Sequence, residues 1–275
     1  MKTNTLLHDV TGDGEPIVLL PGGLSGWLSW IPHAERLSAD RKVVRVQLRS
    51  VEIAEAGEPF PPDYSVETER DALLATVDKL GLDTFDLVGW SHGGGIALAF
   101  TLEYPERVRS LTVIEPQASW ILKQTGTAVD ALAEAEKFER EVAGREITVD
   151  DLKGFIVRAG LGQPGDDFES MPGWPVWVRN RQVLSAVHTL IDFAESLQRL
   201  RSLSVPVLGV RGTDSSAVDS AIVGELVANV QDGRLLELPG DHAAHLQNFE
   251  RFLEELIGHI GYASAMSRDR ETSHA

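Results

Sequence analysis

The stretch that decides the fold is residues 85–103, which read FDLVGWSHGGGIALAFTLE. Residues 85–89 are expected to form a short buried strand, and residues 94–103 a helix. Between them, residues 89–93 carry the pattern Gly-x-Ser-x-Gly. In this context the pattern predicts a tight turn that lifts the Ser91 hydroxyl clear of the sheet at a helix N-terminus. Developing negative charge is stabilised there, so we predict that Ser91 is a nucleophile.

Strands alternate with helices on both sides of this motif. Further strands are expected at residues 17–20, 42–48, 110–114, 206–210 and 234–238, and helices at 65–80 and 249–260. The first residues, from Thr5 on, predict a hairpin that turns at Asp13 and Gly14. Strands that alternate with helices at this spacing predict an α/β fold with a parallel sheet and helices on both faces.

The alternation breaks between residues 119 and 195, where helical patterns occur without a convincing strand. We therefore expect residues 1–118 to be the first part of the sheet domain and residues 119–195 to be a helical cap laid over it. Residues 196–262 would complete the sheet domain, and residues 263–275 would form a polar, frayed tail.

Composition excludes several classes of protein. Hydrophobic residues make up 43% and charged residues 24% of the 275 residues, which are globular proportions. The absence of cysteine excludes disulfides, thiolate catalysis and Cys-ligated metals. The 25 basic and 42 acidic residues give a net charge of −17, which argues against nucleic-acid and anionic-membrane partners. Residues 1–14 have no signal-peptide apolar region, so we expect a cytoplasmic protein; the oligomeric state is not predicted.

A serine hydroxyl needs a general base to become a good nucleophile. Among the eight histidines, His242 is the strongest candidate because it ends the stretch 238–242, LPGDH, just after the last expected strand. That position lies at the same carboxyl edge of the sheet as Ser91. His245 is one helical turn further on and could compete, but we expect it to pack or to orient the loop.

These motifs resemble those of the α/β-hydrolase superfamily over residues 5–260. The matching parts are LLPGG at 19–23, GWSHG at 89–93, YPERV at 104–108 and HAAHL at 242–246. The resemblance implies a mostly parallel, eight-stranded sheet with a cap inserted after strand six, and a triad in the chain order Ser, acid, His. It names no substrate, since this fold supports many reactions.

The chain departs from the family pattern near the oxyanion site. The family usually has His-Gly where this chain has Pro21 and Gly22, and the loop after Leu48 lacks the usual Asp-x-Arg-Gly pattern. By the resemblance, the backbone N–H of Gly23 can still serve as one oxyanion donor, and that of His92 as the other.

The triad acid is the third departure. The usual site follows strand seven as Gly-x-x-Asp, but residues 212–215 read GTDS and put Asp214 one residue early. One branch of the family places a glutamate directly after strand six, where this chain has Glu115. We favour Glu115, because its position directly follows its strand and its side chain has the longer reach, and we keep Asp214 as the alternative.

Tryptophans stand close in the sequence to the expected mouth of the active site. They are Trp27, Trp90, Trp120, Trp174 and Trp177. We expect them to form a pocket for a bulky apolar part of a substrate.

The function predicted from these residues is hydrolysis of a small-molecule carboxylic ester or lactone that has a bulky apolar part, through a Ser-His-acid triad and an acyl-enzyme, with no metal or cofactor. One alternative is a carbon–carbon bond hydrolase that uses the same triad, with Arg179 or Arg181 holding a substrate carboxylate. Another is a non-catalytic receptor for a small ligand on the same fold.

Overall fold

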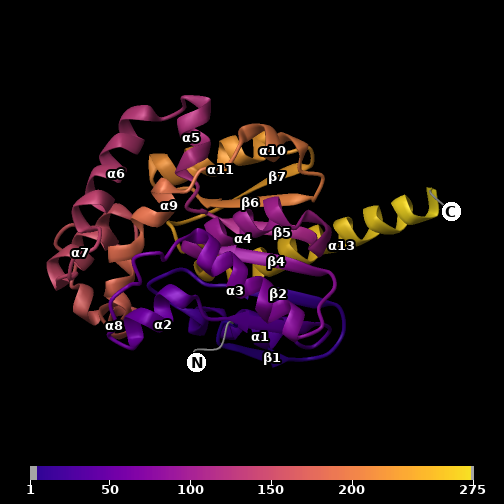
Figure 1. Ribbon diagram of the computed structural model, residues 1–275, viewed down its shortest axis with the longest axis horizontal. Helices are drawn as coiled ribbons and strands as arrows, with labels where there is room; N and C mark the ends of the chain where they lie inside the picture. Colours follow the sequence, from indigo (N-terminus) through magenta and orange to yellow (C-terminus); the bar gives the residue numbers. More distant parts are fainter. Residues whose placement is uncertain (1–4, 274–275) are drawn as a thin grey trace.

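The computed structural model describes residues 5–273, and at its centre lies one sheet of seven strands in the order β1-β3-β2-β4-β5-β6-β7 (Figure 1). The strands are β1 (His8–Thr11), β2 (Pro16–Leu20), β3 (Lys42–Val46), β4 (Phe85–Trp90), β5 (Val108–Ile114), β6 (Val207–Gly212) and β7 (Gly233–Leu238). All neighbours pair in parallel except β1, which is antiparallel to β3. The predicted α/β class and mostly parallel sheet are confirmed.

Two expectations about the sheet are wrong within residues 5–273. The sheet has seven strands rather than eight, and its first strand does not form a hairpin with the second. Instead β1 pairs with β3, with His8 opposite Val46. The reason is that β2 lies between β3 and β4, so both of its edges are already hydrogen-bonded, and only the outer edge of β3 is open to β1.

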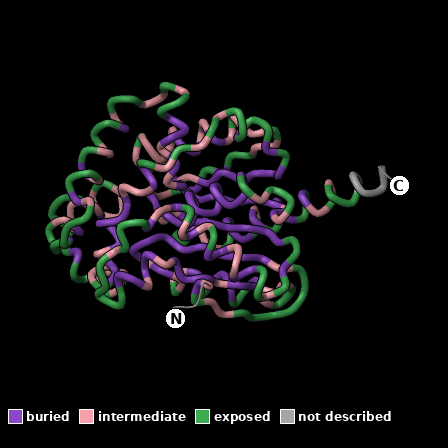
Figure 2. Tube along the Cα trace, viewed as in Figure 1, coloured by how far each residue is buried: buried purple, intermediate pink, exposed green. Residues whose placement is uncertain are grey.

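Helices cover both faces of the sheet. They are α1 (Ile31–Leu37), α2 (Arg49–Glu55), α3 (Val66–Lys79), α4 (His92–Glu103), α5 (Ser119–Thr125), α6 (Val129–Val142), α7 (Val149–Arg158), α8 (Trp174–Asn180), α9 (His188–Asp192), α10 (Leu197–Ser202), α11 (Ala217–Asn229), α12 (Ala244–Gln247) and α13 (Phe249–Ser273). Short 3-10 turns lie at Trp27–Trp30, Pro105–Arg107, Phe168–Ser170 and Arg181–Ala186. Apolar residues of α3, α4 and α11 belong to one buried cluster and those of α1 and α13 to another. The strands of the sheet are mostly buried between these helices (Figure 2).

Helix α13 is longer than expected and projects from the body of the protein (Figure 1). The expectation of a helix that ends near residue 260, followed by a frayed tail, is wrong up to Ser273; residues 274–275 lie outside the described part. Residues 261–273 contain no proline, and Ala263 is buried, so packing carries the helix past Ile260. The hydroxyl of Ser264 donates to the carbonyl oxygen of Ile260 at 2.9 Å within the same helix.

Helices α5 to α9 gather at one end of the sheet (Figure 1). They have an apolar cluster of their own, in which Val142, Ile147, Leu152 and Ile156 are buried. Residues 119–202 contain no strand. Because residues of α6 and α7 line a cavity together with Ser91, this helical layer lies over the carboxyl ends of the strands.

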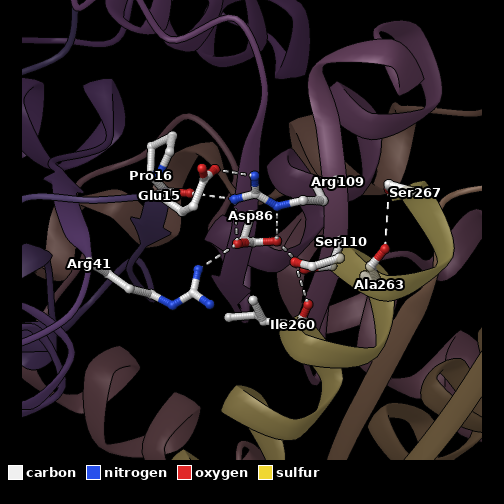
Figure 3. Close-up of polar contacts among 10 residues, drawn as sticks. Glu15, Pro16, Arg41, Asp86, Arg109, Ser110, Ile260, Ala263 and Ser267 are labelled. Atoms are coloured by element: carbon white, nitrogen blue, oxygen red, sulfur yellow. Dashed lines mark hydrogen bonds and ion pairs between the residues drawn. The ribbon is translucent and has the colours of Figure 1, made fainter. Parts of the chain in front are cut away.

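A buried ion cluster ties together the opposite end of the sheet (Figure 3). Asp86, at the start of β4, accepts hydrogen bonds from Arg41 at 3.0 Å and from the Ser110 hydroxyl at 2.8 Å. Arg109 reaches both oxygens of the same carboxylate, at 3.1 and 2.8 Å. A fully buried charge requires such complete pairing, and these bonds fix the amino ends of β4 and β5. The two strands are thereby held in the register that positions Ser91 and Glu115 at their other ends.

Candidate active site

Ser91 lies in the turn between β4 and α4, with backbone angles φ 53° and ψ −117°. The tightness of the turn explains the flanking glycines. A Cβ atom added to Gly93 would collide with the carbonyl oxygen of Pro21, and one added to Gly89 would collide with that of Gly93. The Ser91 N–H donates to Ile114 at the end of β5, at 2.8 Å, which couples the turn to the neighbouring strand.

Two cavities meet at Ser91. The larger, of about 370 Å³, is lined by Ser91 and His242 and by residues of α6, α7 and α11. The smaller, of about 30 Å³, is lined by Ser91 and His242 together with Gly23 and His92. The chain thus brings these four residues to one place, although they come from three separate parts of the sequence.

Glu115 is the carboxylate that lies beside His242. Its Oε2 accepts a hydrogen bond from His242 Nδ1 at 2.7 Å, and both side chains are buried. Its Oε1 accepts from the Gly212 N–H at 2.7 Å and from the hydroxyl of Ser215. The backbone of Glu115 has a φ of 41°, which is uncommon for a residue with a side chain. Such strain is retained where the surroundings impose it, most often at functional sites.

The pKa of His242 is set by opposing influences. Burial lowers the pKa, because it disfavours the charged imidazole, but the hydrogen bond and the charge of Glu115 outweigh burial. The negative charges of Asp219 and Asp241 act in the same direction. The net result is a His242 pKa above its ordinary value of 6.5.

Asp214, the alternative acid, lies elsewhere. Its side chain is exposed in the turn after β6, and its N–H donates to the carbonyl oxygen of Gly240 at 2.8 Å. The turn 212–215 instead presents the Gly212 N–H and the Ser215 hydroxyl to Glu115. The structure therefore brings Glu115, not Asp214, to His242.

Gly23 and His92 stand next to each other at the smaller cavity. A Cβ atom added to Gly23 would lie 3.6 Å from the Cβ atom of His92. His92 is the first residue of α4, and the first N–H groups of a helix have no partner within the helix. Burial lowers the pKa of the His92 imidazole to about 4, against the opposing effect of a hydrogen bond with Gln117, so that side chain stays neutral.

His245 is a packing residue in this structure. Its ring is fully buried and lies 4.7 Å from the ring of Trp90 and 5.3 Å from that of Trp30, measured between centroids. Burial holds its pKa well below 6.5. His245 lines neither cavity at Ser91.

Of the five tryptophans expected at the pocket, only Trp90 lines a cavity that contains Ser91. Trp27 is half-buried beneath the Arg45 guanidinium, and Trp120 is part of the main core. Trp174 and Trp177 pack into the apolar cluster of the helical layer. The aromatic side chains that line the larger cavity are those of Phe138 and Phe155, on α6 and α7.

Comparison with known proteins identifies the family. The model of the Alpha/beta hydrolase family matches residues 17–255. This chain belongs to the α/β-hydrolase family. The predicted family resemblance is therefore confirmed.

Individual relatives of this α/β hydrolase include several kinds of enzyme. Over 113 residues it is 38% identical to the 2-hydroxy-6-oxo-2,4-heptadienoate hydrolase of Pseudomonas putida, an alignment that covers 40% of each chain. It is 24% identical to carboxylesterase YbfK of Bacillus subtilis over 247 residues, or 87% of this chain and 77% of the relative. The crystal structure of the enol-lactonase from Burkholderia xenovorans LB400 superimposes with a TM-score of 0.66 at 20% identity, over 93% of this chain and 96% of the other. At this identity the likeness shows a shared fold and nothing about the substrate.

Sequence reasoning missed Asp219, in the first turn of α11. Within residues 5–273, Glu115, Asp219 and His242 form a group with the spacing of a metal site, with one ligand atom of each within 4.8 Å of the others. Both oxygens of Glu115 already accept hydrogen bonds, and Nδ1 of His242 supplies one of them. Glu115 and His242 are thus engaged with each other, and the carboxylate of Asp219 accepts from the Ser216 hydroxyl at 2.6 Å. The sequence did hold one signal for Asp219, since the stretch Ser216-Ala-Val-Asp219 is typical of the start of a helix.

Among the helices of residues 5–273, none is both long and apolar enough to cross a lipid bilayer.

Proposed function

We propose that this α/β hydrolase is a serine hydrolase that cleaves a carboxylic ester or a lactone through an acyl-enzyme on Ser91. The observation that carries the proposal is the 2.7 Å hydrogen bond between His242 Nδ1 and Glu115, beside a cavity that Ser91 also lines. With Nδ1 donating to the carboxylate, the neutral imidazole keeps its free lone pair on Nε2. That nitrogen is then available to take a proton from the Ser91 hydroxyl.

The reaction begins when Ser91 Oγ attacks the substrate carbonyl carbon and His242 Nε2 takes the hydroxyl proton. Glu115 stabilises the imidazolium, and the N–H groups of Gly23 and His92 donate to the new oxyanion. The tetrahedral intermediate collapses, the bond to the leaving oxygen breaks, and His242 returns the proton to the alkoxide. Water activated by the same imidazole then hydrolyses the acyl-enzyme. Side chains and backbone N–H groups of this chain stabilise each charge and transfer each proton in these steps, so the mechanism requires no metal or cofactor.

The walls of the larger cavity support a bulky apolar substrate. Leu132 and Phe138 of α6, Phe155 of α7 and Leu190 of α9 line it, and its volume of about 370 Å³ suits a small organic molecule. These helices belong to residues 119–195, which we propose act as a cap. The length and branching of the substrate would then be selected by the cap rather than by the sheet.

Carbon–carbon bond hydrolysis is the second candidate, because one relative is named as a heptadienoate hydrolase. A dienoate carries a carboxylate, which needs a cation in the pocket. Neither Arg179 nor Arg181 lines the cavity, and Arg181 is held by the carbonyl oxygens of Ile147 and Val178 at 2.9 and 2.7 Å. Among the described lining residues the basic side chain is that of Arg158, which is exposed, whereas four lining residues carry carboxyl groups, namely Glu134, Glu136, Glu139 and Asp219. A neutral ester or lactone fits these charges better.

Turnover of p-nitrophenyl esters of increasing chain length tests the proposal. We expect the wild-type protein to hydrolyse them, and Ser91→Ala to reduce kcat by on the order of 10⁴ while keeping the circular dichroism of the wild type. A non-catalytic receptor would bind such esters without turnover. If folded Ser91→Ala hydrolysed the esters as fast as the wild type, Ser91 would not be the nucleophile.

A further inference from the structure

We infer that Asp219 is a positioning residue for the reaction: its carboxylate acts with that of Glu115 to stabilise the protonated imidazole of His242. The inference rests on the proposed function. The three side chains come from separate elements, since Glu115 follows β5, Asp219 lies on α11 and His242 follows β7. One polar atom of each lies within 4.8 Å of the other two. At that separation an opposite charge shifts a pKa by roughly 1 to 3 units in a protein.

Asp219 is held in place by the start of its own helix. The hydroxyl of Ser216 donates to Oδ2 of Asp219 at 2.6 Å and accepts from the Asp219 N–H at 3.1 Å. This reciprocal pair fixes the carboxylate without help from a substrate. Its position is therefore already set in the resting enzyme, which is what electrostatic stabilisation of a transient charge requires.

The two carboxylates approach His242 differently. Asp219 lines the larger cavity with Ser91 and His242, whereas Glu115 lines neither cavity. Glu115 also shares its charge, because its Oε1 accepts from the Gly212 N–H and from the Ser215 hydroxyl. Donors to a carboxylate stabilise its charged form and lower its basicity. A second carboxylate on the cavity side compensates for this loss of negative potential at the imidazole.

The surrounding groups are consistent with this role. His242 also faces Asp241 of its own loop, and the neighbouring His245 is kept neutral by burial. Across the cavity, Glu139 of α6 has its pKa raised to about 8 by burial and by the charges of Asp219 and Glu136. Glu139 is therefore mostly protonated at neutral pH. The pKa of Asp219 is raised, chiefly by burial and also by the charge of Glu115, whereas a positive charge on His242 lowers it. Protonation of His242 therefore favours the ionised form of Asp219, and ionised Asp219 in turn favours protonated His242.

The test replaces Asp219 with asparagine, which keeps the shape and removes the charge. Two quantities are measured: the pKa of His242 by NMR titration of its imidazole, and the acid limb of the pH profile of kcat/KM. We expect both to fall by about 1 unit, and kcat to fall roughly tenfold, in Asp219→Asn. Ser216→Ala, which frees the carboxylate but keeps its charge, should give smaller shifts in the same direction.

Asp214→Asn is the matched control, because it removes the same charge from an exposed position in the turn that precedes α11. It should leave both quantities unchanged. An unchanged His242 pKa in folded Asp219→Asn would overturn the inference, as would an equal shift in the control. The NMR titration needs no turnover, so it decides the coupling even if the protein hydrolyses no ester. Failure of ester hydrolysis in the wild type would count against the proposed function instead.

Discussion

The indole Nε1–H of Trp90 donates a hydrogen bond to the backbone carbonyl oxygen of His242 at 3.0 Å. Trp90 immediately precedes Ser91, so this bond ties the turn that carries the proposed nucleophile to the loop that carries the proposed base. The Trp90 ring also packs edge-on against His245, in the short helix after His242. Trp90 thus links the backbone next to Ser91 to the backbone of His242.

Replacing Trp90 with phenylalanine keeps most of the packing and removes the donor. We expect kcat to fall roughly tenfold or more with a smaller effect on KM, because a loosened base misaligns proton transfer. Steady-state kinetics on one ester measures this. Trp120→Phe is the control, since Trp120 is buried away from both cavities. Equal losses of kcat in the two variants would show that the indole hydrogen bond has no special part.

The assignment of the acid can be tested with two amide variants. Glu115→Gln should reduce kcat by on the order of 10³ to 10⁴, because the imidazole loses the carboxylate that orients it and stabilises its charge. Asp214→Asn should cost less than tenfold, as its side chain is exposed in the turn. Both are measured on the same ester. A large loss at Asp214 with near-normal activity at Glu115 would reverse the assignment.

Charge in the cavity predicts discrimination against anions. The neutral p-nitrophenyl butyrate should have a kcat/KM at least tenfold above that of the p-nitrophenyl monoester of succinate, which has a carboxylate in place of a methyl group. Because the pKa of Glu139 is about 8, the preference should increase as pH rises through 8 and Glu139 ionises. Glu139→Gln should remove that increase. A preference for the succinate ester would favour carbon–carbon hydrolysis of carboxylate-bearing substrates instead.

Buried histidines predict a loss of stability in acid. Burial lowers the pKa of His33 from 6.5 to about 4, against a smaller opposing influence of the His245 backbone. Between those values the unfolded chain binds more protons than the folded one, so the free energy of unfolding falls as pH falls. His33 alone accounts for about 2 kcal/mol between pH 7 and pH 5. Urea unfolding at the two pH values measures the change, and His33→Asn should lose less; equal stability at both would contradict this account.

Much of the sheet could be predicted because its strands are continuous apolar runs. Residues such as Ile17 and Leu87 are buried in a parallel sheet, and burial on both faces is visible in the sequence as a mostly apolar run rather than as an alternation of apolar and polar residues. The proximity of Glu115 to His242 was also predictable, because a residue directly after a strand has little freedom of position. The partner of β1 was not, since strand pairing depends on which edges are left open.

The cavity could not be predicted from the sequence. Its walls depend on how the helices between residues 119 and 195 pack, and this packing turns Trp174 and Trp177 into a local core while it exposes Phe155 to the cavity. Asp219 was missed for a similar reason. Its approach to His242 depends on the direction in which α11 leaves β6, which local sequence does not specify.

We propose that Ser91 is the nucleophile and that His242, oriented by Glu115, activates it. The most direct measurement is the intact mass of the protein after reaction with a fluorophosphonate, followed by peptide mapping. We predict one adduct per chain, on Ser91, with no labelling of Ser91→Ala and slow labelling of Glu115→Gln. An unlabelled wild-type protein, or an adduct on another residue, would contradict the account.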